Sequence, residues 1–367
     1  SDVPEAHHQG RGRGRSQRIR QKNGRGVTRL TIKDLAKLSG YSLGTVSRVL
    51  NNQPNVSEQA RKTILALVEE HGFERNASAQ LLKQQRTKSV LIVVKGTSNE
   101  MFAAMVEKLQ SLFADTDHPV IADFIDEDDN EVRRAAQLCR ERKPSGVLFL
   151  GGNNENFRGD FGRIDVPSVV VTNDARELGF PNLSSVSTDD CKGAACAVEH
   201  LLACGHRDII VLGGDRAISD TSAKRYEGCV EAFRKNGLTF DDETMYYTGR
   251  YSYEFGYNGM KQALRERKKL TAVFAMADVI AIGAIRALFD EGLRVPEDIS
   301  VAGYDGLRIG GYFVPKLTTI AQSVDLLAEC SFDLLLSCMQ GAQAQHLTVP
   351  FRLLTRQSVR QITEIEG

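Results

Sequence analysis

Short apolar runs alternate with helix-length amphipathic stretches from Ser89 onward, and this rhythm constrains the fold more than any other feature. Each run has the length of a buried strand, and each intervening stretch can form a helix that covers a sheet. The runs comprise residues 90–94, 119–125, 146–150, 168–171, 209–212, 271–275 and 299–302. Such alternation predicts parallel sheets with helices on both faces. Because so many units exceed one comfortable sheet, we expect an α/β core of two parallel-sheet subdomains within residues 88–367.

The N-terminal part of the chain carries an excess of positive charge. Residues 1–90 hold 17 basic and 7 acidic residues, whereas the 367-residue chain as a whole is balanced at 47 of each sign. This asymmetry predicts a basic module for a polyanion, joined to an acidic globular body. Residues 1–27 interleave arginine with glycine and have almost nothing apolar to bury, so we expect a disordered basic arm there.

Residues 28–75 show helical periodicity and tight turns, with no strand signal. Thr31, followed three residues later by an aspartate, has the spacing of a helix N-cap, which predicts a short helix that ends before Gly40. Gly40 can adopt the left-handed conformation of a helix end, and Ser42 can cap a second helix over residues 43–50. Helix, tight turn and helix together are typical of a helix-turn-helix DNA-binding domain.

A third helix completes this all-α module, with Ser57 as its expected N-cap and Gly72 as its end. Its apolar face repeats at helical spacing and comprises Ile64, Leu67, Val68 and His71. That face can close a small core against side chains of the first two helices, namely Leu35, Ala36, Val46 and Val49.

The second helix of a helix-turn-helix domain enters the DNA major groove with its N-terminal residues foremost. The predicted DNA contacts of the module are Thr31, Ser42, Leu43, Gly44, Thr45, Ser47, Arg48 and Asn55. Arg48 is the strongest candidate for contact with the edge of a base, because a planar guanidinium can donate hydrogen bonds to the two acceptors of guanine. A phosphate contact or a solvated surface charge is the alternative for Arg48.

Four stretches of the sequence carry a resemblance to a known family. In chain order they are TIKDLAKLSGYSLGTVSRVLNN, VSTDDCKGAACAVEHLLACGHRDIIVLGG, KRYEGCVEAFRKNGL and VPEDISVAGYDG. Together they resemble the lactose-repressor/galactose-repressor family of bacterial transcription regulators. The resemblance implies a homodimeric repressor that reads a near-palindromic operator in double-stranded DNA. It also implies a periplasmic-binding-protein-like core, with a small-molecule effector between its two subdomains.

The resemblance further assigns residues 76–87 to a hinge helix and linker, and it implies that this hinge helix folds when the protein binds DNA. It implies DNA contacts for Ala79, Gln80 and Leu82, with Leu82 wedged into the minor groove. Gln80 replaces an arginine that is common in the family, which predicts a weaker phosphate contact from the hinge. The alternative for Leu82 is that it merely ends a helix packed on the core.

Candidate effector contacts follow the predicted strands, because ligands of open α/β sheets bind beyond the carboxyl ends of the strands. Ser98 and Asn99 come after the first strand, and Phe102 could stack on a sugar ring. The resemblance implies that Arg225 and Asp305 contact the effector. For each of these two residues alone, a structural ion pair or a turn-capping role is the alternative.

Two positions depart from the family pattern. The resemblance places both Thr172 and Ala277 at the effector site. The family often has aspartate at the first of these positions and asparagine at the second, so two polar contacts of a sugar site would be absent. We therefore expect the effector to be a sugar, a sugar derivative or a nucleobase that is either less hydroxylated than a plain sugar or modified.

Other acidic residues are interpreted as structural. Asp278, and either Asp189 or Asp190, are expected to cap the helices that they open. Residues 126–129 form an acidic run, but they lack the glycine and the terminal glutamate of a calcium loop. We therefore expect a solvated loop at this run.

The sequence offers no convincing catalytic or metal site. Cys196, His200 and Cys204 are spaced along one face of a helix, which favours core packing over zinc binding. A G-x-S-x-G match at residues 40–44 follows a helix rather than the strand that a hydrolase needs. We therefore expect neither an enzyme nor a cofactor.

The remaining classes are separated by location and by the N-terminal module. All seven cysteines lie beyond residue 138 without a disulfide pattern, and no apolar run could span a membrane, which favours a cytoplasmic protein. A transport-type sugar-binding protein would share the cleft but would have a secretion signal and no DNA-binding module. An α/β enzyme with an accidental basic N-terminus would pair a nucleophile with a base, and we find no such pair.

Overall fold

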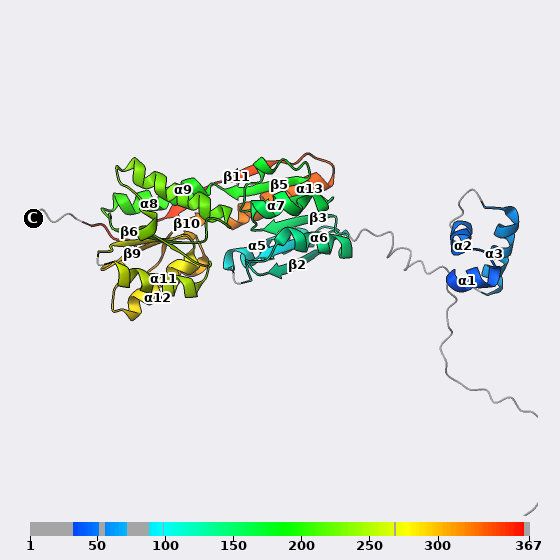
Figure 1. Ribbon diagram of the computed structural model, residues 1–367, viewed down its shortest axis with the longest axis horizontal. Helices are drawn as coiled ribbons and strands as arrows, with labels where there is room; N and C mark the ends of the chain where they lie inside the picture. Colours follow the sequence, from blue (N-terminus) through cyan, green and yellow to red (C-terminus); the bar gives the residue numbers. More distant parts are fainter. Residues whose placement is uncertain (1–31, 51–55, 72–87, 98, 268, 363–367) are drawn as a thin grey trace, which may run out of the picture. The chain divides into compact units, whose positions relative to one another are not determined.

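The computed structural model describes residues 32–50, 56–71, 88–97, 99–267 and 269–362 (Figure 1). The chain divides into two compact units, residues 1–84 and 85–367. We call the described part of the first unit the headpiece and that of the second unit the core. The predicted basic arm, residues 1–27, and the whole of the predicted hinge, residues 76–87, lie outside the described residues.

The headpiece contains three helices, as the sequence predicts. They are α1 (Ile32–Ser39), α2 (Leu43–Leu50) and α3 (Glu58–Glu70). One side chain of α1, two of α2 and one of α3 meet in its apolar core, namely Leu35, Val46, Val49 and Ile64. Burial of these apolar side chains against one another holds three short helices that would be marginal in isolation.

The turn and the described caps of the headpiece form as expected. Gly40 adopts a φ of +71°, the left-handed conformation that glycine permits. The hydroxyls of Ser42 and Ser57 each accept a hydrogen bond from a first-turn amide. His71 was predicted to extend the apolar face of α3, but it is exposed, because the helix has ended and His71 is its C-cap residue. Thr31 lies outside the described residues.

The core contains two six-stranded sheets. The strand order is β11-β5-β4-β3-β1-β2 in the first sheet and β12-β10-β9-β8-β6-β7 in the second. All neighbouring strands are parallel except β10 and β12, which pair antiparallel. The first sheet comprises β1 (Val90–Lys95), β2 (Val120–Ile125), β3 (Gly146–Leu150), β4 (Ser168–Val171), β5 (Leu183–Thr188) and β11 (His346–Val349). The second comprises β6 (Ile209–Gly213), β7 (Tyr246–Thr248), β8 (Ala272–Ala275), β9 (Ser300–Asp305), β10 (Thr318–Gln322) and β12 (Phe351–Leu354).

Helices cover both faces of each sheet, so each sheet and its helices form one subdomain. On the first sheet the apolar side chains of one face pack against α5 (Glu100–Ala114) and α13 (Val324–Met339), and those of the other against α6 (Glu131–Arg142) and α7 (Asn154–Asp160). The second sheet packs against α11 (Tyr253–Glu266) and α12 (Asp278–Asp290) on one face, and against α8 (Asp190–Ala203) and α9 (Asp220–Lys235) on the other. The short helix α10 (Asp242–Met245) precedes β7.

All seven apolar runs in the sequence form strands, and five further strands were not expected. The unexpected strands, β5, β7, β10, β11 and β12, are short or carry hydroxyl side chains. Strand β5 has the sequence LSSVST and is buried throughout. The Ser185 hydroxyl lies 2.8 Å from His346 Nδ1 and accepts a hydrogen bond from the Ala175 amide, so distant segments supply the partners that make this burial possible.

The chain passes between the two subdomains three times, and each passage is one residue long. Asp189 joins β5 to α8, Ser323 joins β10 to α13, and Pro350 joins β11 to β12. The joined strands stand at or next to the same end of each strand order. Strands β2 and β7 stand at the opposite ends, so they are the edges that no covalent connection holds together.

Two glycines bring α11 and α12 into backbone contact. A Cβ atom on Gly256 would lie 2.1 Å from the Ile280 carbonyl oxygen, and one on Gly283 would lie 2.2 Å from the Tyr253 carbonyl oxygen. Because real Cβ atoms do not approach backbone so closely, only glycine allows this packing. The contact fixes the first turn of α11, which begins directly after a segment that lines the cavity described below.

We expect Gly283→Ala to lower the free energy of unfolding by about 1–3 kcal/mol, because the backbones of α11 and α12 must separate. Gly159→Ala is the matched control, since it is also a helical glycine but a Cβ there meets nothing within 4 Å. The control should keep or slightly raise the stability. Chemical denaturation followed by circular dichroism compares the two variants, and equal stabilities would contradict the close packing.

Candidate effector cavity and DNA-reading helix

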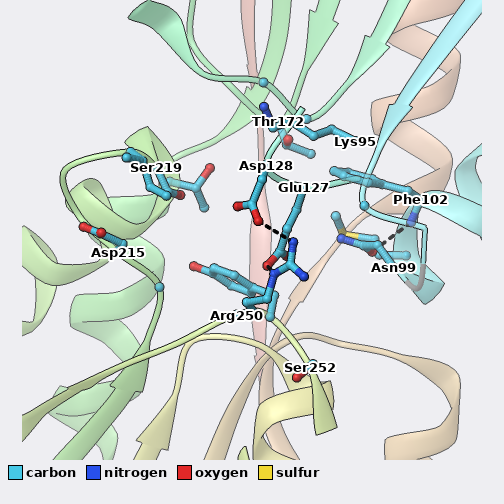
Figure 2. Close-up of a pocket in the computed structure, with 18 of the residues that line it drawn as sticks. Lys95, Asn99, Phe102, Glu127, Asp128, Thr172, Asp215, Ser219, Arg250 and Ser252 are labelled. Atoms are coloured by element: carbon cyan, nitrogen blue, oxygen red, sulfur yellow. Dashed lines mark hydrogen bonds and ion pairs between the residues drawn. The ribbon is translucent and has the colours of Figure 1, made fainter. Parts of the chain in front are cut away.

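A cavity of about 500 Å³ lies in the core at the carboxyl ends of strands from both sheets (Figure 2). Residues that follow β1, β2, β3 and β4 of the first sheet line it, together with residues at the ends of β6, β7, β9 and β10 of the second. Apolar, hydroxyl, amide and charged side chains are mixed in its walls, as in sites for small polar molecules.

Most of the predicted effector residues are brought together in this cavity. Those that line it are Asn99, Phe102, Thr172, Arg225 and Asp305. The prediction for Ala277 is wrong, because its methyl group packs in the apolar core and does not face the cavity. Ser98 lies outside the described residues.

Asn99 positions the aromatic wall of the cavity. Its side-chain oxygen accepts a hydrogen bond from the Phe102 amide at 3.1 Å and so caps α5. The Phe102 ring lies against Gly151, where a Cβ atom would come within 2.9 Å of the ring. Thr172, directly after β4, also lines the cavity; it has a φ of +78°, and its hydroxyl lies 3.4 Å from the Asn173 side-chain oxygen.

Arg225 is a buried cation held by contacts on several sides. Its Nε donates to Asp190 Oδ1 at 2.8 Å, and its Nη1 donates to the Met276 carbonyl. The guanidinium carbon lies 3.7 Å from the centroid of the Tyr304 ring. Burial alone would lower the pKa of Arg225, but the carboxylates of Asp190 and Asp305 outweigh it and the pKa is raised. The guanidinium is therefore charged and has a fixed orientation in the cavity wall.

Asp305 places an acceptor beside the Arg225 donors. Its Oδ1 lies 3.7 Å from Arg225 Nη2 and accepts a hydrogen bond from Gln322 Nε2 at 2.9 Å. Burial raises the pKa of Asp305 to about 6, although the charge of Arg225 opposes that shift. A carboxylate next to an N–H donor can bind adjacent hydroxyl groups of a ligand, accepting from one and donating to the next.

The predicted aspartate caps have three different outcomes. Asp189 caps α8 as expected, accepting from the Lys192 amide at 3.0 Å. Asp190 instead serves as the counter-ion of Arg225. The cap prediction for Asp278 is wrong. Asp278 is the first residue of α12, and its buried carboxylate reaches away from the helix to accept from the Thr319 hydroxyl and the Leu307 amide.

A charged cluster that was not predicted from the sequence borders the cavity. Asp126, Glu127 and Asp128 follow β2, and all three carboxylates contact the guanidinium of Arg250, which follows β7. Figure 2 shows Glu127 and Asp128 beside Arg250. Residues 126–128, which we call the acidic loop, are solvated as predicted, with 53% of the Asp126 side chain and 69% of the Asp128 side chain exposed, but the ion pairs with Arg250 were not expected. No local signal could have revealed the cluster, because its partners are more than 120 residues apart in the sequence.

Helix α2 displays a polar face and buries an apolar one. Its predicted DNA contacts Ser42, Leu43, Gly44 and Arg48 are exposed, and Thr45 and Ser47 are half-buried. Val46 and Val49 point into the headpiece core on the other side of the helix. The remaining predicted DNA contacts, Thr31, Asn55, Ala79, Gln80 and Leu82, lie outside the described residues.

Several alternative sites find no support within the described part of the chain. There, no group of three or more His, Cys, Asp or Glu side chains could hold a metal ion. The seven cysteines are all free thiols. None of the helices described is long and apolar enough to cross a membrane.

Both units match known sequence families. Residues 31–76 match "Bacterial regulatory proteins, lacI family", and residues 198–359 match "Periplasmic binding protein-like domain". The transcriptional regulator MalR of Clostridium butyricum is 33% identical over 338 residues, which cover 90% of this chain and 99% of MalR. The chain belongs to the LacI family. The repressor PurR of Serratia proteamaculans is 31% identical over 339 residues, covering 90% of this chain and 96% of PurR.

Solved structures of LacI-family proteins have the same fold. The lac repressor dimer bound to operator and the anti-inducer ONPF aligns with a TM-score of 0.66 and 26% identity, over 90% of this chain and 99% of that one. The CelR–cellobiose complex aligns with a TM-score of 0.65 and 26% identity, over 90% and 100%. The curated relatives are transcriptional regulators and repressors, so this LacI-family chain is a regulator and not an enzyme.

We expect Asp305→Asn to stabilise the ligand-free protein near pH 7.5, by about 3 kcal/mol at most, from the shift between 3.8 and about 6. The folded chain binds the Asp305 proton more tightly than the unfolded chain, so the wild type loses stability as pH rises from about 4 through 6. The advantage of the variant should therefore shrink toward pH 4.

Thermal unfolding of both proteins between pH 4 and pH 8 measures this difference. A stability loss in Asp305→Asn that is constant with pH would instead assign Asp305 a purely structural role as a counter-ion of Arg225.

Proposed function

We propose that this LacI-family regulator is a repressor that binds a near-palindromic operator as a homodimer, and that a sugar or sugar derivative in the cavity controls it. The observation that carries the proposal is the presence, in one chain, of an exposed helix-turn-helix face and a cavity walled by Arg225, Asp305 and Phe102. A transport-type binding protein would not need the headpiece. Because such a repressor acts on DNA, we extend the proposal to a cytoplasmic location.

The headpiece would read DNA through α2. The helix presents Leu43 and Gly44 to solvent in its first turn, at the end that enters the major groove in this kind of domain. Arg48 is exposed in its last turn. Arg48 would then contact a guanine edge. The basic N-terminal region would add phosphate contacts that do not depend on sequence.

The charges of the cavity favour an uncharged effector. Each of the three cationic side chains that line it already pairs with a carboxylate: Lys95 with Glu131, Arg225 with Asp190, and Arg250 with the acidic loop. A phosphate or carboxylate on the effector would therefore compete with an existing ion pair. A polyol can instead use the unpaired edge of Asp305 and the face of Phe102, which favours a sugar over an anionic metabolite.

A relative of known structure supports a homodimer. The lac repressor was solved as a dimer bound to operator. A dimer would also supply the two headpieces that a near-palindromic operator needs.

Effector control follows from linkage between the two sites. The effector contacts both subdomains, so it favours the arrangement of subdomains in which its contacts are best. It changes operator affinity only by its differential affinity for the two arrangements. An effector that prefers the arrangement incompatible with DNA is an inducer, and one that prefers the other is a corepressor.

Selection from sheared genomic DNA of the source organism tests DNA recognition. The wild-type protein should retain a few fragments that share a near-palindrome. Arg48→Ala should bind them about 5 to 150 times more weakly and should relax the preference at one base pair, as expected for loss of a bidentate base contact. Lys62→Ala is the control, because it removes one exposed positive charge from α3 rather than from α2. Retention without sequence preference in the wild type would overturn the proposal.

The sugar nominated by the genes beside those fragments tests the effector site. We expect Arg225→Lys to keep a charge near Asp190 but to lose the planar fork, so that the sugar alters operator affinity at least tenfold less effectively. Affinity for the operator without sugar should stay nearly unchanged. Arg216→Lys is the control, since it pairs with Asp242 at the surface, outside the cavity. An unaltered sugar response in Arg225→Lys would exclude the assigned effector site.

A further inference from the structure

The two subdomains are held together by side chains at the end of the cleft that lacks covalent connections. The three one-residue passages stand near β5, β10, β11 and β12, whereas the acidic loop and Arg250 follow the opposite edge strands, β2 and β7. When the subdomains rotate about the three passages, the edges farthest from the passages separate most. Contacts between the acidic loop and Arg250 therefore oppose opening of the cleft more effectively than equal contacts near the passages.

Arg250 is shared among three carboxylates of the other subdomain. Its Nη2 donates to Asp126 and, at 2.7 Å, to Asp128. Its Nε donates to Glu127, and Figure 2 shows Glu127 and Asp128 beside the guanidinium. One guanidinium thus neutralises part of a cluster of three negative charges. Without it, these like charges would repel one another and would have no partner across the cleft.

Each side of this cluster is held in place by contacts within its own subdomain. In the acidic loop, Asp126 Oδ1 accepts from the Asp128 amide at 3.0 Å, and Lys95 Nζ holds the Asp129 carbonyl at 2.7 Å. The Asp128 amide and Arg250 together lower the pKa of Asp126, so this carboxylate is ionised at neutral pH. Because the loop is already shaped to present its carboxylates, little entropy is lost when Arg250 binds.

The segment that carries Arg250 is equally constrained. The Gly249 amide donates to the Gly213 carbonyl at 3.0 Å, and a Cβ on Gly249 would lie 2.0 Å from the Phe255 ring. The Ser252 amide donates to the Arg250 carbonyl at 2.8 Å. These contacts therefore fix the position of the Arg250 backbone, from which the side chain extends toward the acidic loop.

A second group of contacts across the cleft can report on opening. The Asn154 amide donates to Asp220 Oδ2 at 2.6 Å, and Asn153 Nδ2 donates to the Ile218 carbonyl at 2.8 Å. These bonds join α7 of the first subdomain to the region before and at the start of α9 of the second. They do not involve the acidic loop or Arg250, and they can persist only while the cleft is closed.

We propose that Arg250 and the acidic loop Asp126–Asp128 form an ionic latch that holds the cavity closed before any effector binds. The effector must then enter through transient opening of the latch, and the strength of the latch sets how much of the protein is closed. Arg250 is half-exposed, with 53% of its side-chain surface accessible, so salt in the solvent weakens the latch. The latch is independent of the identity of the effector.

Hydrogen exchange of the full-length protein, measured by mass spectrometry without effector or DNA, tests the latch. We expect Arg250→Gln to speed exchange about threefold to tenfold in peptides that contain residues 151–156 and 214–219, because the Asn154 amide loses its partner when the cleft opens. At 1 M salt, where the screening length is about 3 Å, the wild type should approach the variant. Equal exchange in both proteins at low salt would overturn the proposal.

Arg294→Gln is the matched control. Arg294 also makes two exposed contacts with a carboxylate, but Asp298 lies in the same subdomain, so this variant should not change exchange at residues 151–156. A general loss of stability would instead speed exchange in both variants and throughout the core.

A double-mutant cycle tests whether Arg250 and the acidic loop act through each other. Replacing Glu127 and Asp128 by Gln and Asn should speed exchange at the same reporter peptides, and adding Arg250→Gln should then have almost no further effect. If the combined variant speeds exchange by the product of the two separate increases, Arg250 and the loop do not act together. The cycle needs neither operator nor effector, so failure of the latch and failure of the proposed function are distinguishable.

Discussion

Three one-residue passages between the subdomains are the constraint on which the rest of the core depends. Each passage is a single residue, namely Asp189, Ser323 or Pro350, and is too short to let the sheets move apart. The two sheets must therefore meet with the carboxyl ends of their strands adjacent. Residues that follow β1, β3 and β4 therefore face residues that follow β6, β9 and β10. A cavity at this junction is a direct result of the connectivity, and any ligand in it touches both subdomains.

The electrostatics of the cavity is organised around Arg225. Burying a guanidinium is costly unless charges and dipoles replace the lost water, and Asp190, Tyr304 and the Met276 carbonyl supply them. Asp305 also lies beside the Arg225 charge, and its carboxylate lines the cavity. Its raised pKa shows that the site keeps a carboxylate in an environment that resists its charge, an energetic cost typical of binding sites. The outer Arg250 cluster is different, because its charges remain partly solvated and are available for movement.

Site residues could be predicted where neighbouring residues in the sequence indicate their role, and could not be predicted where the role depends on distant residues. Asn99 and Phe102 could be placed because they follow a strand in the sequence, and Arg225 and Asp305 because they stand in recognisable motifs. Ala277 was misplaced, since nothing in its neighbours shows whether its methyl group faces the cavity or the core. Asp278 has the sequence context of a helix cap, yet its carboxylate serves the Leu307 amide and the Thr319 hydroxyl, which come close only after the second sheet has formed.

The sequence by itself determined the local structure and the family. Apolar periodicity placed seven of the strands, Gly40 and Ser42 set the turn before α2, and short motifs carried the likeness to LacI-family regulators. Only the tertiary structure decided which residues meet across the cleft, and that strand LSSVST is buried throughout. The physical reason is that helix caps and amphipathic faces depend on residues a few positions apart. A buried hydroxyl or an ion pair such as Arg250 with Asp128 depends instead on partners that only the fold brings together.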